Sequence, residues 1–183
     1  MRQRDKFTKR ALSEGYKARS VYKLKSINSR FRLIKPGIKV LDLGAFPGSW
    51  SQYCLELDAK VDAVDLKDVK IDGIKFIKAD IFNDEIFSLL STYDLVLSDI
   101  APNTTGIRFL DSEKSYDLGV RALEIAKKVL VRDGNFVCKL FQSEKFNEFV
   151  NEVKKNFKLV RIVKPEGSKK LSREMYIVAI RKI

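Results

Sequence analysis

The sequence predicts an α/β protein whose sheet is mostly parallel, with helices on both faces. From about residue 38, short apolar runs typical of buried strands alternate with amphipathic helical segments. Near the end, only EGSKKLSR (166–173) separates two strand-like runs, whereas a parallel crossover needs about a dozen residues or more. We therefore expect the last strand to be antiparallel.

The strand-like runs are rich in Val, Ile, Leu and Phe and end at polar residues, glycine or proline. In order they are KVLDLGA (39–45), KVDAVDL (60–66), IKFIKADIF (74–82), YDLVLSDIAPN (93–103), GNFVCKLFQ (134–142), KLVRIVKP (158–165) and EMYIVAI (174–180). The helical segments between them show apolar residues at helical spacing. They cover residues 49–57, 83–93 with Asn83 as the N-cap, 112–132 and 144–157.

The composition excludes several classes of protein. No apolar stretch approaches the roughly 20 residues of a membrane span, and the charged start MRQRDKFTKR has no signal-like apolar segment behind it. We therefore expect a cytoplasmic protein. The chain contains no histidine, which excludes His-based triads and His-ligated zinc, so we predict no metal site. Cys54 and Cys138 have no metal or redox spacing and are expected to be reduced core thiols.

The excess positive charge is concentrated at the N-terminus. Of a net charge of +12, residues 1–35 contribute +10, because 12 Lys or Arg stand against Asp5 and Glu14. Such asymmetry is typical of proteins that bind a polyanion, most often nucleic acid. We predict one domain over residues 1–183, with a basic arm at 1–35 and an α/β core at 36–183.

The arm itself should be partly helical. Apolar residues recur at helical spacing across residues 17–34, so one face should pack on the core. The basic side chains would then be largely exposed, either on a solvated face or in contact with phosphates. They are Lys17, Arg19, Lys23, Lys25 and Arg30.

Polar residues collect at the carboxyl ends of the predicted parallel strands, where doubly wound sheets bind ligands. Asp65, Asp80 and Asp99 lie at the ends of three of these strands. Lys139 lies late in GNFVCKLFQ (134–142), an unusual place because lysine is rarely buried unless it is paired. These residues are the candidates for a site.

The glycine loop after the first strand indicates which ligand would bind. Gly44 and, 21 residues later, Asp65 follow the pattern of a nucleoside site, in which a carboxylate binds the ribose hydroxyls. The chain lacks the G-x-G-x-x-G triplet of NAD-binding proteins and has Gly44, Pro47 and Gly48 instead. This favours a nucleoside without phosphates, such as S-adenosylmethionine, whose adenine amino group would suit Asp80.

A series of segments runs in order over nearly the whole chain and is highly specific as a set. The segments are YKARSVYKL (16–24), LDLGAFPGSWSQY (41–53), DL (65–66), LSDIAPNTTG (97–106), YDL (116–118), VCKLFQ (137–142) and SREMYIVA (172–179). Through them the chain resembles the FtsJ/RrmJ-like ribose 2′-O-methyltransferases. The family's loop more often reads GAAPGGW, so Phe46 and Ser49 are departures that alter the contour of the cofactor loop.

The resemblance implies a fold, a cofactor and a set of site residues. The fold is the Rossmann-like class I methyltransferase fold, with a seven-stranded, mostly parallel sheet and an antiparallel last strand. The catalytic tetrad would be Lys23, Asp99, Lys139 and Glu174. Together with the glycine loop, the predicted S-adenosylmethionine contacts are Gly44, Pro47, Gly48, Trp50, Asp65, Asp80 and Asp99.

The chemistry explains why such a tetrad would be needed. Methyl transfer to a ribose 2′-OH is an in-line displacement in which the alcohol must be aligned and must lose its proton. A lysine amine can take that proton where burial and a neighbouring positive charge favour its neutral form. Our hypothesis is that Lys139 is the base, with Lys23 as its positive neighbour. Asp99 would lie beside the positive centre of the cofactor, while Lys23 and Glu174 position the ribose.

The predicted partner is RNA. For RNA contact we predict Lys9, Arg10, Tyr16, Arg19 and Tyr22, with packing of the arm as the alternative for Tyr16, Arg19 and Tyr22. The family favours a uridine of large-subunit (23S-type) rRNA, in the large ribosomal subunit or its precursor. We expect a monomer with no membrane partner.

Other functions stay open at this point. The same chemistry could act on the tRNA anticodon loop. A non-catalytic RNA-binding module on a methyltransferase fold and an NAD-dependent oxidoreductase belong to other classes. Base C5 methylation needs a cysteine nucleophile, and Cys138 should point away from Lys139 because side chains alternate along a strand.

Overall fold

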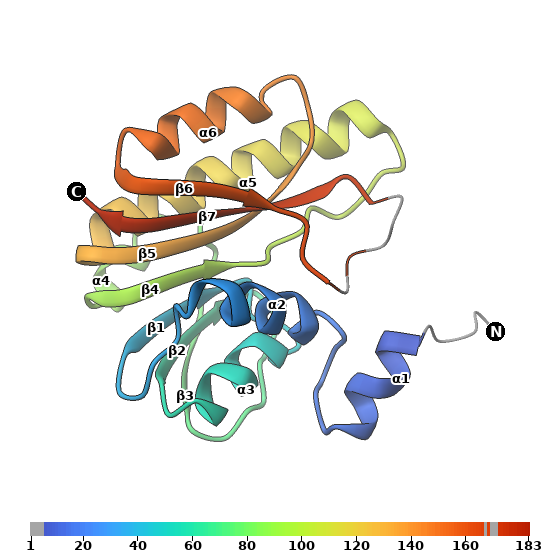
Figure 1. Ribbon diagram of the computed structural model, residues 1–183, viewed down its shortest axis with the longest axis vertical. Helices are drawn as coiled ribbons and strands as arrows, with labels where there is room; N and C mark the ends of the chain where they lie inside the picture. The colour runs from blue at the N-terminus through green and yellow to red at the C-terminus, as the bar shows by residue number, and fades with distance from the viewer. Residues whose placement is uncertain (1–5, 167, 169–171) are drawn as a thin grey trace.

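Seven strands form one sheet in the order β3-β2-β1-β4-β5-β7-β6 in the computed structural model (Figure 1). The structure describes residues 6–166, 168 and 172–183. The strands are β1 (Lys39–Leu43), β2 (Lys60–Asp65), β3 (Ile74–Lys78), β4 (Tyr93–Ser98), β5 (Leu130–Phe141), β6 (Phe157–Val163) and β7 (Glu174–Lys182). Neighbours from β3 to β5 are parallel, whereas β7 is antiparallel to both β5 and β6. The predicted sheet with its antiparallel last strand is confirmed.

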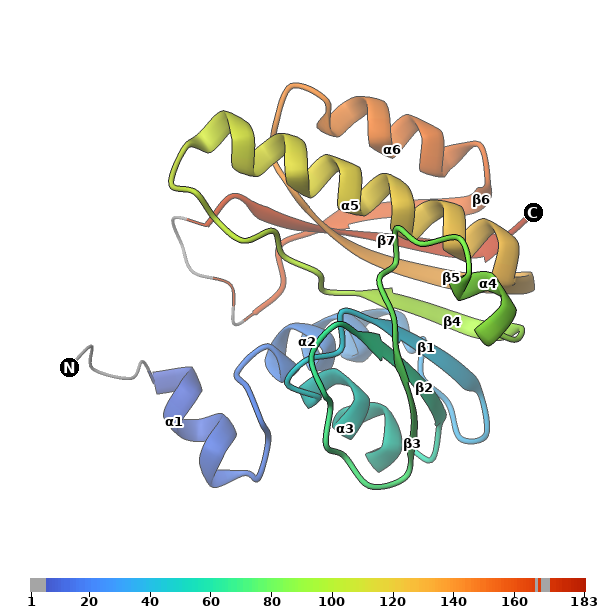
Figure 2. The same cartoon turned by 180° about the vertical axis from the view of Figure 1, so that it is seen from behind.

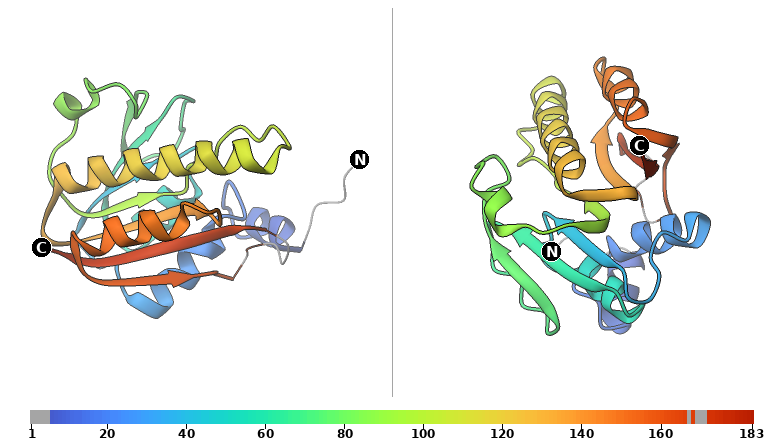
Figure 3. Two further views of the ribbon diagram at one scale, coloured as in Figure 1. Left: turned by 90° about the horizontal axis from the view of Figure 1, so that it is seen from above. Right: turned by 90° about the vertical axis from the view of Figure 1, so that its left-hand side faces the viewer.

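Helices cover both faces of this sheet. The helices of the described residues are α1 (Lys6–Ser13), α2 (Val21–Phe31), α3 (Ser49–Glu56), α4 (Ile86–Leu89), α5 (Arg108–Val129) and α6 (Phe146–Lys154). The helices α5 and α6 lie on one face, and α2 and α3 lie on the other, as Figures 1 and 2 show from opposite sides. The end-on view in Figure 3 places the sheet between the two helical layers.

Alternation along the strands divides the core into two clusters. In β1, Val40 packs in the cluster that contains Trp50 of α3, while Leu41 packs in the cluster that contains Ile125 of α5. Successive side chains of a strand point to opposite faces, so a single strand supplies both clusters.

The same alternation decides where Lys139 points. Its β5 neighbours Cys138 and Leu140 belong to the cluster beneath α5 and α6, whereas Val137 belongs to the cluster beneath α2 and α3. Lys139 therefore faces the side of α2, and the predicted opposition of Cys138 and Lys139 follows from the observed strand.

Two predicted helices have different bounds in the structure. The segment predicted as a helix over 83–93 is helical only in α4, because the Asn83 side chain accepts a hydrogen bond from the Glu85 N–H in a turn and Tyr93 pairs with Leu130 as the start of β4. The N-cap of α4 is Glu85, so the prediction that Asn83 is the N-cap is wrong. The helix predicted over 112–132 starts earlier, at Arg108, and its predicted last turn belongs to β5.

Strands β3 and β4 end before their predicted limits. Asp80 lies beyond β3, where its Oδ1 atom accepts the Phe82 N–H at 2.9 Å in a turn. Asp99 directly follows β4, and Pro102 has no N–H to continue a ladder. Both carboxylates therefore lie in loops at the edge of the sheet rather than within strands.

The arm forms two helices, and one of its lysines is buried. The predicted helix over 17–34 corresponds to α2, and α1 precedes it. Lys25 is half-buried and Arg30 is exposed, but Lys23 is only 7% exposed. The expectation that Lys23 faces solvent is wrong, because it lies on the side of α2 that faces the sheet and pairs with Glu174. None of the helices described is long and apolar enough to cross a membrane.

Candidate active site

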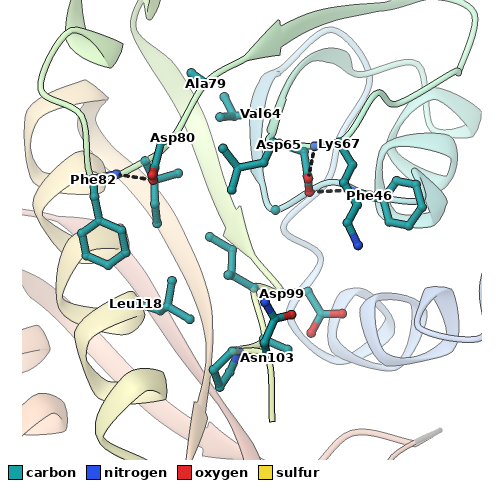
Figure 4. A pocket seen from close by; sticks show the side chains of 16 residues that line it. Phe46, Val64, Asp65, Lys67, Ala79, Asp80, Phe82, Asp99, Asn103 and Leu118 are labelled. Atoms are coloured by element: carbon teal, nitrogen blue, oxygen red, sulfur yellow. Dashed lines mark hydrogen bonds between the residues drawn. The ribbon is translucent and has the colours of Figure 1, made fainter. Parts of the chain in front are cut away.

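A cavity of about 470 Å³ opens at the carboxyl ends of β1, β2 and β4, next to the point where the strand order reverses (Figure 4). Open α/β sheets bind ligands at this position because the loops diverge there to either side. Its lining includes the predicted residues Gly44, Asp65, Asp80 and Asp99. The structure thus brings together residues that the sequence separates by up to 55 positions.

Two glycines shape the loop that borders this cavity. Gly44 has a φ of +72°, and a Cβ atom there would lie 2.3 Å from the Ile100 side chain. Gly48 has a φ of +111°, and its Cβ would lie 2.6 Å from Ile71. Any other residue would be strained in backbone and would clash at both positions. The loop therefore passes close to its neighbours and leaves room at the end of β1.

The aspartates at the cavity are held by backbone donors. Asp65 accepts the Phe46 N–H at 2.9 Å through one carboxylate oxygen and the Lys67 N–H at 2.8 Å through the other, as the dashed lines in Figure 4 show. Asp80 is fixed by its contact with Phe82. Each carboxylate oxygen can accept a second hydrogen bond, so Asp65 and Asp80 can still accept donors from a ligand.

Two ion pairs lie beside the cavity. The Nζ atom of Lys139 is 3.0 Å from Oδ1 of Asp99 and donates to the Asp99 backbone carbonyl at 2.6 Å. The Nζ atom of Lys23 is 2.8 Å from Oε1 of Glu174. Asp99 lines the cavity as well. It is therefore the residue that joins the cavity to the ion pairs.

Tyr176 lies between the two ion pairs and was not predicted as a site residue. Its fully buried hydroxyl donates to Oδ1 of Asp99 at 2.5 Å, and the Nζ atom of Lys23 lies 5.6 Å from the centre of its ring. The missed signal was strand periodicity, because Glu174 and Tyr176 are two residues apart and share a face of β7. Tyr176 of β7 therefore contacts both α2, through Lys23, and the loop after β4, through Asp99.

The register of β5 and β7 explains how this cluster forms. Lys139 is paired with Tyr176 across the antiparallel ladder, and Phe141 is paired with Glu174. Directly opposed residues have neighbouring side chains on the same face. That face is covered by α2, which brings Lys23 to Glu174. The antiparallel last strand is therefore what delivers the acidic partner of Lys23.

The electrostatics of the cluster favour an ionised Asp99. Burial opposes ionisation, but the ammonium of Lys139, that of Lys23 and the Tyr176 hydroxyl together hold the pKa of Asp99 below its usual range. In the same environment burial and the carboxylate of Asp99 raise the pKa of Tyr176 well above its usual value. Tyr176 therefore acts as a hydrogen-bond donor and remains a neutral phenol.

A second carboxylate, Asp42 of β1, is buried behind the cavity. Burial raises its pKa to about 7, and its main polar contact is the Ser51 hydroxyl, which donates at 2.7 Å. Asp99 and Asp65 also raise this pKa. The sequence did not single out Asp42, since one acidic residue in an apolar run does not reveal its neighbours.

Three of the predicted cofactor residues do not line the cavity. Pro47 and Gly48 are absent from its lining, and the Trp50 side chain is 2% exposed in the core. The Trp50 indole donates to the Ser20 carbonyl at 2.8 Å and its ring lies 6.0 Å from that of Tyr176. Trp50 thus connects the arm, through Ser20, to Tyr176 of β7. A cofactor contact by Pro47, Gly48 and Trp50 stays a prediction.

The predicted RNA-binding residues divide into two groups. Tyr16 and Tyr22 are buried with Ala11 and Val21, and the Tyr16 hydroxyl donates to Glu56, so their side chains pack the arm. Lys9 and Arg10 are exposed on α1, where Arg10 pairs with Glu14 at 2.7 Å. The half-buried Arg19 lies in the turn before α2. RNA contact by all five residues stays a prediction.

The cysteines do not provide a nucleophile. Both Cys54 and Cys138 are buried, free thiols. Burial raises the pKa of Cys138 to about 12, and that of Cys54 is also raised well above its usual value. Reactivity requires the thiolate, which neither environment favours. Among the described residues there is also no group of three or more His, Cys, Asp or Glu side chains that could hold a metal ion.

This sheet, with its glycine loop and aspartates at the reversal point, defines an S-adenosylmethionine-dependent methyltransferase of the Rossmann-like class. The solved structure of human methyltransferase-like protein 13 in complex with SAH has the same fold, with a TM-score of 0.62 and 18% identity over 86% of this chain and 81% of that chain. A Plasmodium falciparum protein described as a ribosomal RNA methyltransferase matches with a TM-score of 0.82 and 26% identity, over 91% of this chain and 98% of that chain.

The chain belongs to the FtsJ-like methyltransferase family, whose model matches residues 16–182. It is 43% identical to Ribosomal RNA large subunit methyltransferase E of Bdellovibrio bacteriovorus, over 98% of this chain and 97% of that protein. It is 40% identical to the protein of the same name from Wolbachia pipientis wMel, over 96% and 94% of the two chains. The predicted family resemblance, fold class and cofactor are confirmed.

Proposed function

We propose that this chain transfers a methyl group from S-adenosylmethionine to a ribose 2′-OH of large-subunit rRNA, at a uridine, with Lys139 as the general base. The names of the relatives support the substrate. The observation that carries the proposal is the position of Asp99, which lines the cofactor cavity and also contacts Lys139. Asp99 would therefore contact both the methyl donor in the cavity and the base, Lys139.

The cavity suits a nucleoside cofactor. The cavity beside Gly44, the fixed aspartates Asp65 and Asp80 and the ionised Asp99 fit a ligand with ribose hydroxyls, an adenine and a positive centre. Asp65 would hold the ribose and Asp80 the adenine amino group. When bound, S-adenosylmethionine supplies an electrophilic methyl group on a sulfonium.

Lys139 is oriented to remove a proton. To act as a base, Lys139 must first release a proton from its ammonium form. The neutral amine then has two N–H donors and one lone pair in a roughly tetrahedral arrangement. The carboxylate and the carbonyl of Asp99 accept two donors, which leaves one tetrahedral position for the substrate hydroxyl. Lys139 would take the 2′-OH proton as the oxygen attacks the methyl group. Asp99 then pairs with the resulting ammonium.

Lys23 and Glu174 would position the ribose. Their ion pair is almost completely buried, with side chains 9% and 13% exposed. A buried pair is costly to break, so it provides a rigid wall next to Lys139. Lys23 also helps to hold the carboxylate of Asp99 in its ionised form.

The arm would dock the RNA. Its α1 helix lies on the side where the parallel strands end, so Lys9 and Arg10 would meet an RNA strand that enters the site (Figure 1). In this proposal the arm and core act as one domain and as a monomer in the cytoplasm, on the large ribosomal subunit or its precursor.

The decisive experiment maps 2′-O-methyl groups in rRNA and tRNA of cells with and without this protein. We expect one rRNA uridine in the large subunit to lose its methyl group when the protein is absent. The purified protein should then transfer a labelled methyl group to large subunits from the deficient cells.

Other outcomes would overturn the proposal in distinguishable ways. Loss of a methyl group from a tRNA anticodon loop would keep the chemistry and change the substrate. RNA binding with no methyl incorporation would indicate a non-catalytic RNA-binding module. Binding of NADH but not of S-adenosylhomocysteine would indicate an oxidoreductase.

A further inference from the structure

We propose that an exposed apolar patch at the start of α5 stacks against a base of the RNA strand next to the target nucleotide. The Phe109 patch consists of Ile107, Phe109 and Leu110, which are 57%, 67% and 42% exposed. The inference rests on the proposed function, because it assigns a recognition surface to that same site. The ligand of the patch is single-stranded RNA, which the patch would contact through the flat face of one base.

The patch stands on a firmly anchored segment. Asp111 is buried, and its Oδ1 atom accepts the Thr105 N–H at 2.7 Å and the Thr105 hydroxyl at 2.9 Å. The Ser112 hydroxyl donates to the Arg108 carbonyl at 2.8 Å. An aromatic ring on such an anchored turn loses little conformational entropy when a base stacks on it.

The patch is tied to the catalytic tetrad. The guanidinium of Arg173 donates to the Ser112 hydroxyl at 3.0 Å and to the Arg108 carbonyl at 3.4 Å. The next residue, Glu174, forms the ion pair with Lys23. Arg173 therefore links the first turn of α5 to Glu174 of the tetrad. A nucleotide next to the methylated one would reach this turn.

The loop that leads to the patch also borders the cofactor cavity. Asn103 and Pro102 line that cavity, and the chain continues from them through Thr105 to Phe109. An RNA strand whose 2′-OH reaches Lys139 would lie close to this loop. Its side chains are placed to contact the strand on one side of the target.

The charge around the patch favours RNA as the occupant. Arg108 and Lys114 are exposed beside it, and the half-buried Arg173 lies beneath it. Proteins bind single-stranded nucleic acid by combining cationic side chains for the phosphates with aromatic rings for the bases. A patch that docked on an apolar protein surface would not need this cationic surround.

The test compares Phe109→Ala and Phe109→Trp with wild type, using large ribosomal subunits from cells that lack the protein. Because stacking of a base on an aromatic ring contributes to binding affinity, Phe109→Ala should raise the KM for subunits about tenfold or more. The kcat and the Kd for S-adenosylhomocysteine should stay near wild type. Phe109→Trp should restore the KM. The control is Leu89→Ala on α4, another exposed apolar residue (46% exposed) whose loss should leave the KM unchanged. A wild-type KM in Phe109→Ala would overturn the inference.

A crosslink identifies the occupant without requiring turnover. Phe109 is replaced by p-benzoylphenylalanine and the protein is irradiated on the same subunits. A crosslink to rRNA supports the inference, while a crosslink only to ribosomal protein, or none, overturns it. Failure of the proposed function would be seen differently, as absent methyl transfer by the wild-type protein.

Discussion

The Nζ atom of Lys139 contacts Asp99 twice, at 3.0 Å from its carboxylate and at 2.6 Å from its backbone carbonyl. One residue thus fixes the amine through both its side chain and its main chain. Asp99 also lines the cofactor cavity, so the same residue borders the cavity and contacts the amine. In the proposed mechanism, Asp99 is therefore the residue that aligns the base with the methyl donor.

Replacement of Lys139 tests the base directly. Lys139→Ala should lower kcat by about 10²–10⁴-fold, the usual contribution of a general base. Lys139→Arg should be similarly impaired, because a guanidinium does not release its proton. Single-turnover transfer of a labelled methyl group measures the effect, and calorimetry with S-adenosylhomocysteine shows whether the cofactor site is intact. Near wild-type transfer by a folded Lys139→Ala protein would rule out the assignment.

The Tyr176 hydroxyl should support the ionised Asp99. In Tyr176→Phe the carboxylate loses a donor that lowers its pKa, so that pKa should rise. Activity should then fall about tenfold, and its loss on acidification should begin at a higher pH. The pH profile of kcat is the measurement. Tyr116→Phe, whose hydroxyl bonds Glu148 on the surface, is the control and should keep the wild-type profile.

Asp65 should contribute to cofactor affinity. Asp65→Asn leaves one acceptor oxygen where two backbone N–H groups are now bound, so both the loop and the ribose contact should weaken. We expect the Kd for S-adenosylhomocysteine to rise about tenfold or more, as calorimetry would show. Asp68→Asn removes an exposed carboxylate that pairs with Lys78 outside the cavity and should leave the Kd unchanged. Equal effects of the two substitutions would contradict the role of Asp65.

The buried Asp42 should make stability depend on pH. Its pKa of about 7 in the folded protein lies above the ordinary 3.8, so the folded state retains a proton that the unfolded chain releases between about pH 4 and pH 7. Stability from this group is therefore lost as the pH rises through that window.

Asp42→Asn removes this dependence and keeps an oxygen to accept the Ser51 hydroxyl. The free energy of unfolding of Asp42→Asn minus that of wild type should be larger at pH 8 than at pH 5, by on the order of 3 kcal/mol. Urea unfolding at the two pH values measures it. A difference between the proteins that does not change with pH would show that Asp42 is ionised in the folded state.

Salt should weaken RNA binding steeply. The arm carries +10 of the net charge of +12, and each phosphate contact releases counterions. Lys9→Ala should reduce the slope of log K against log salt by up to about 1, whereas Lys154→Ala on α6 should not change it. Filter binding of large-subunit rRNA over a salt series is the measurement. Affinity that does not depend on salt would exclude the arm as the docking surface.

The sequence predicted the parts of the site that follow from strand order. Asp65, Asp80 and Asp99 end parallel strands, and such ends must meet at one edge of the sheet. The short connection before Glu174 likewise required an antiparallel strand. Boundaries were less predictable, since the helix expected over 83–93 was replaced by a turn at Asn83 and by the pairing of Tyr93.

The sequence by itself determined the class of fold, the edge at which the site lies and, through a resemblance over its whole length, the family. Only the tertiary structure decided which side chains touch. Lys23 lost its expected exposure because α2 turns it onto Glu174, a residue 151 positions away. Tyr176 reached Asp99 because the register of β7 on β5 sets it opposite Lys139. Periodicity assigns a residue to a face, but contacts across that face depend on register and helix packing, which no local pattern specifies.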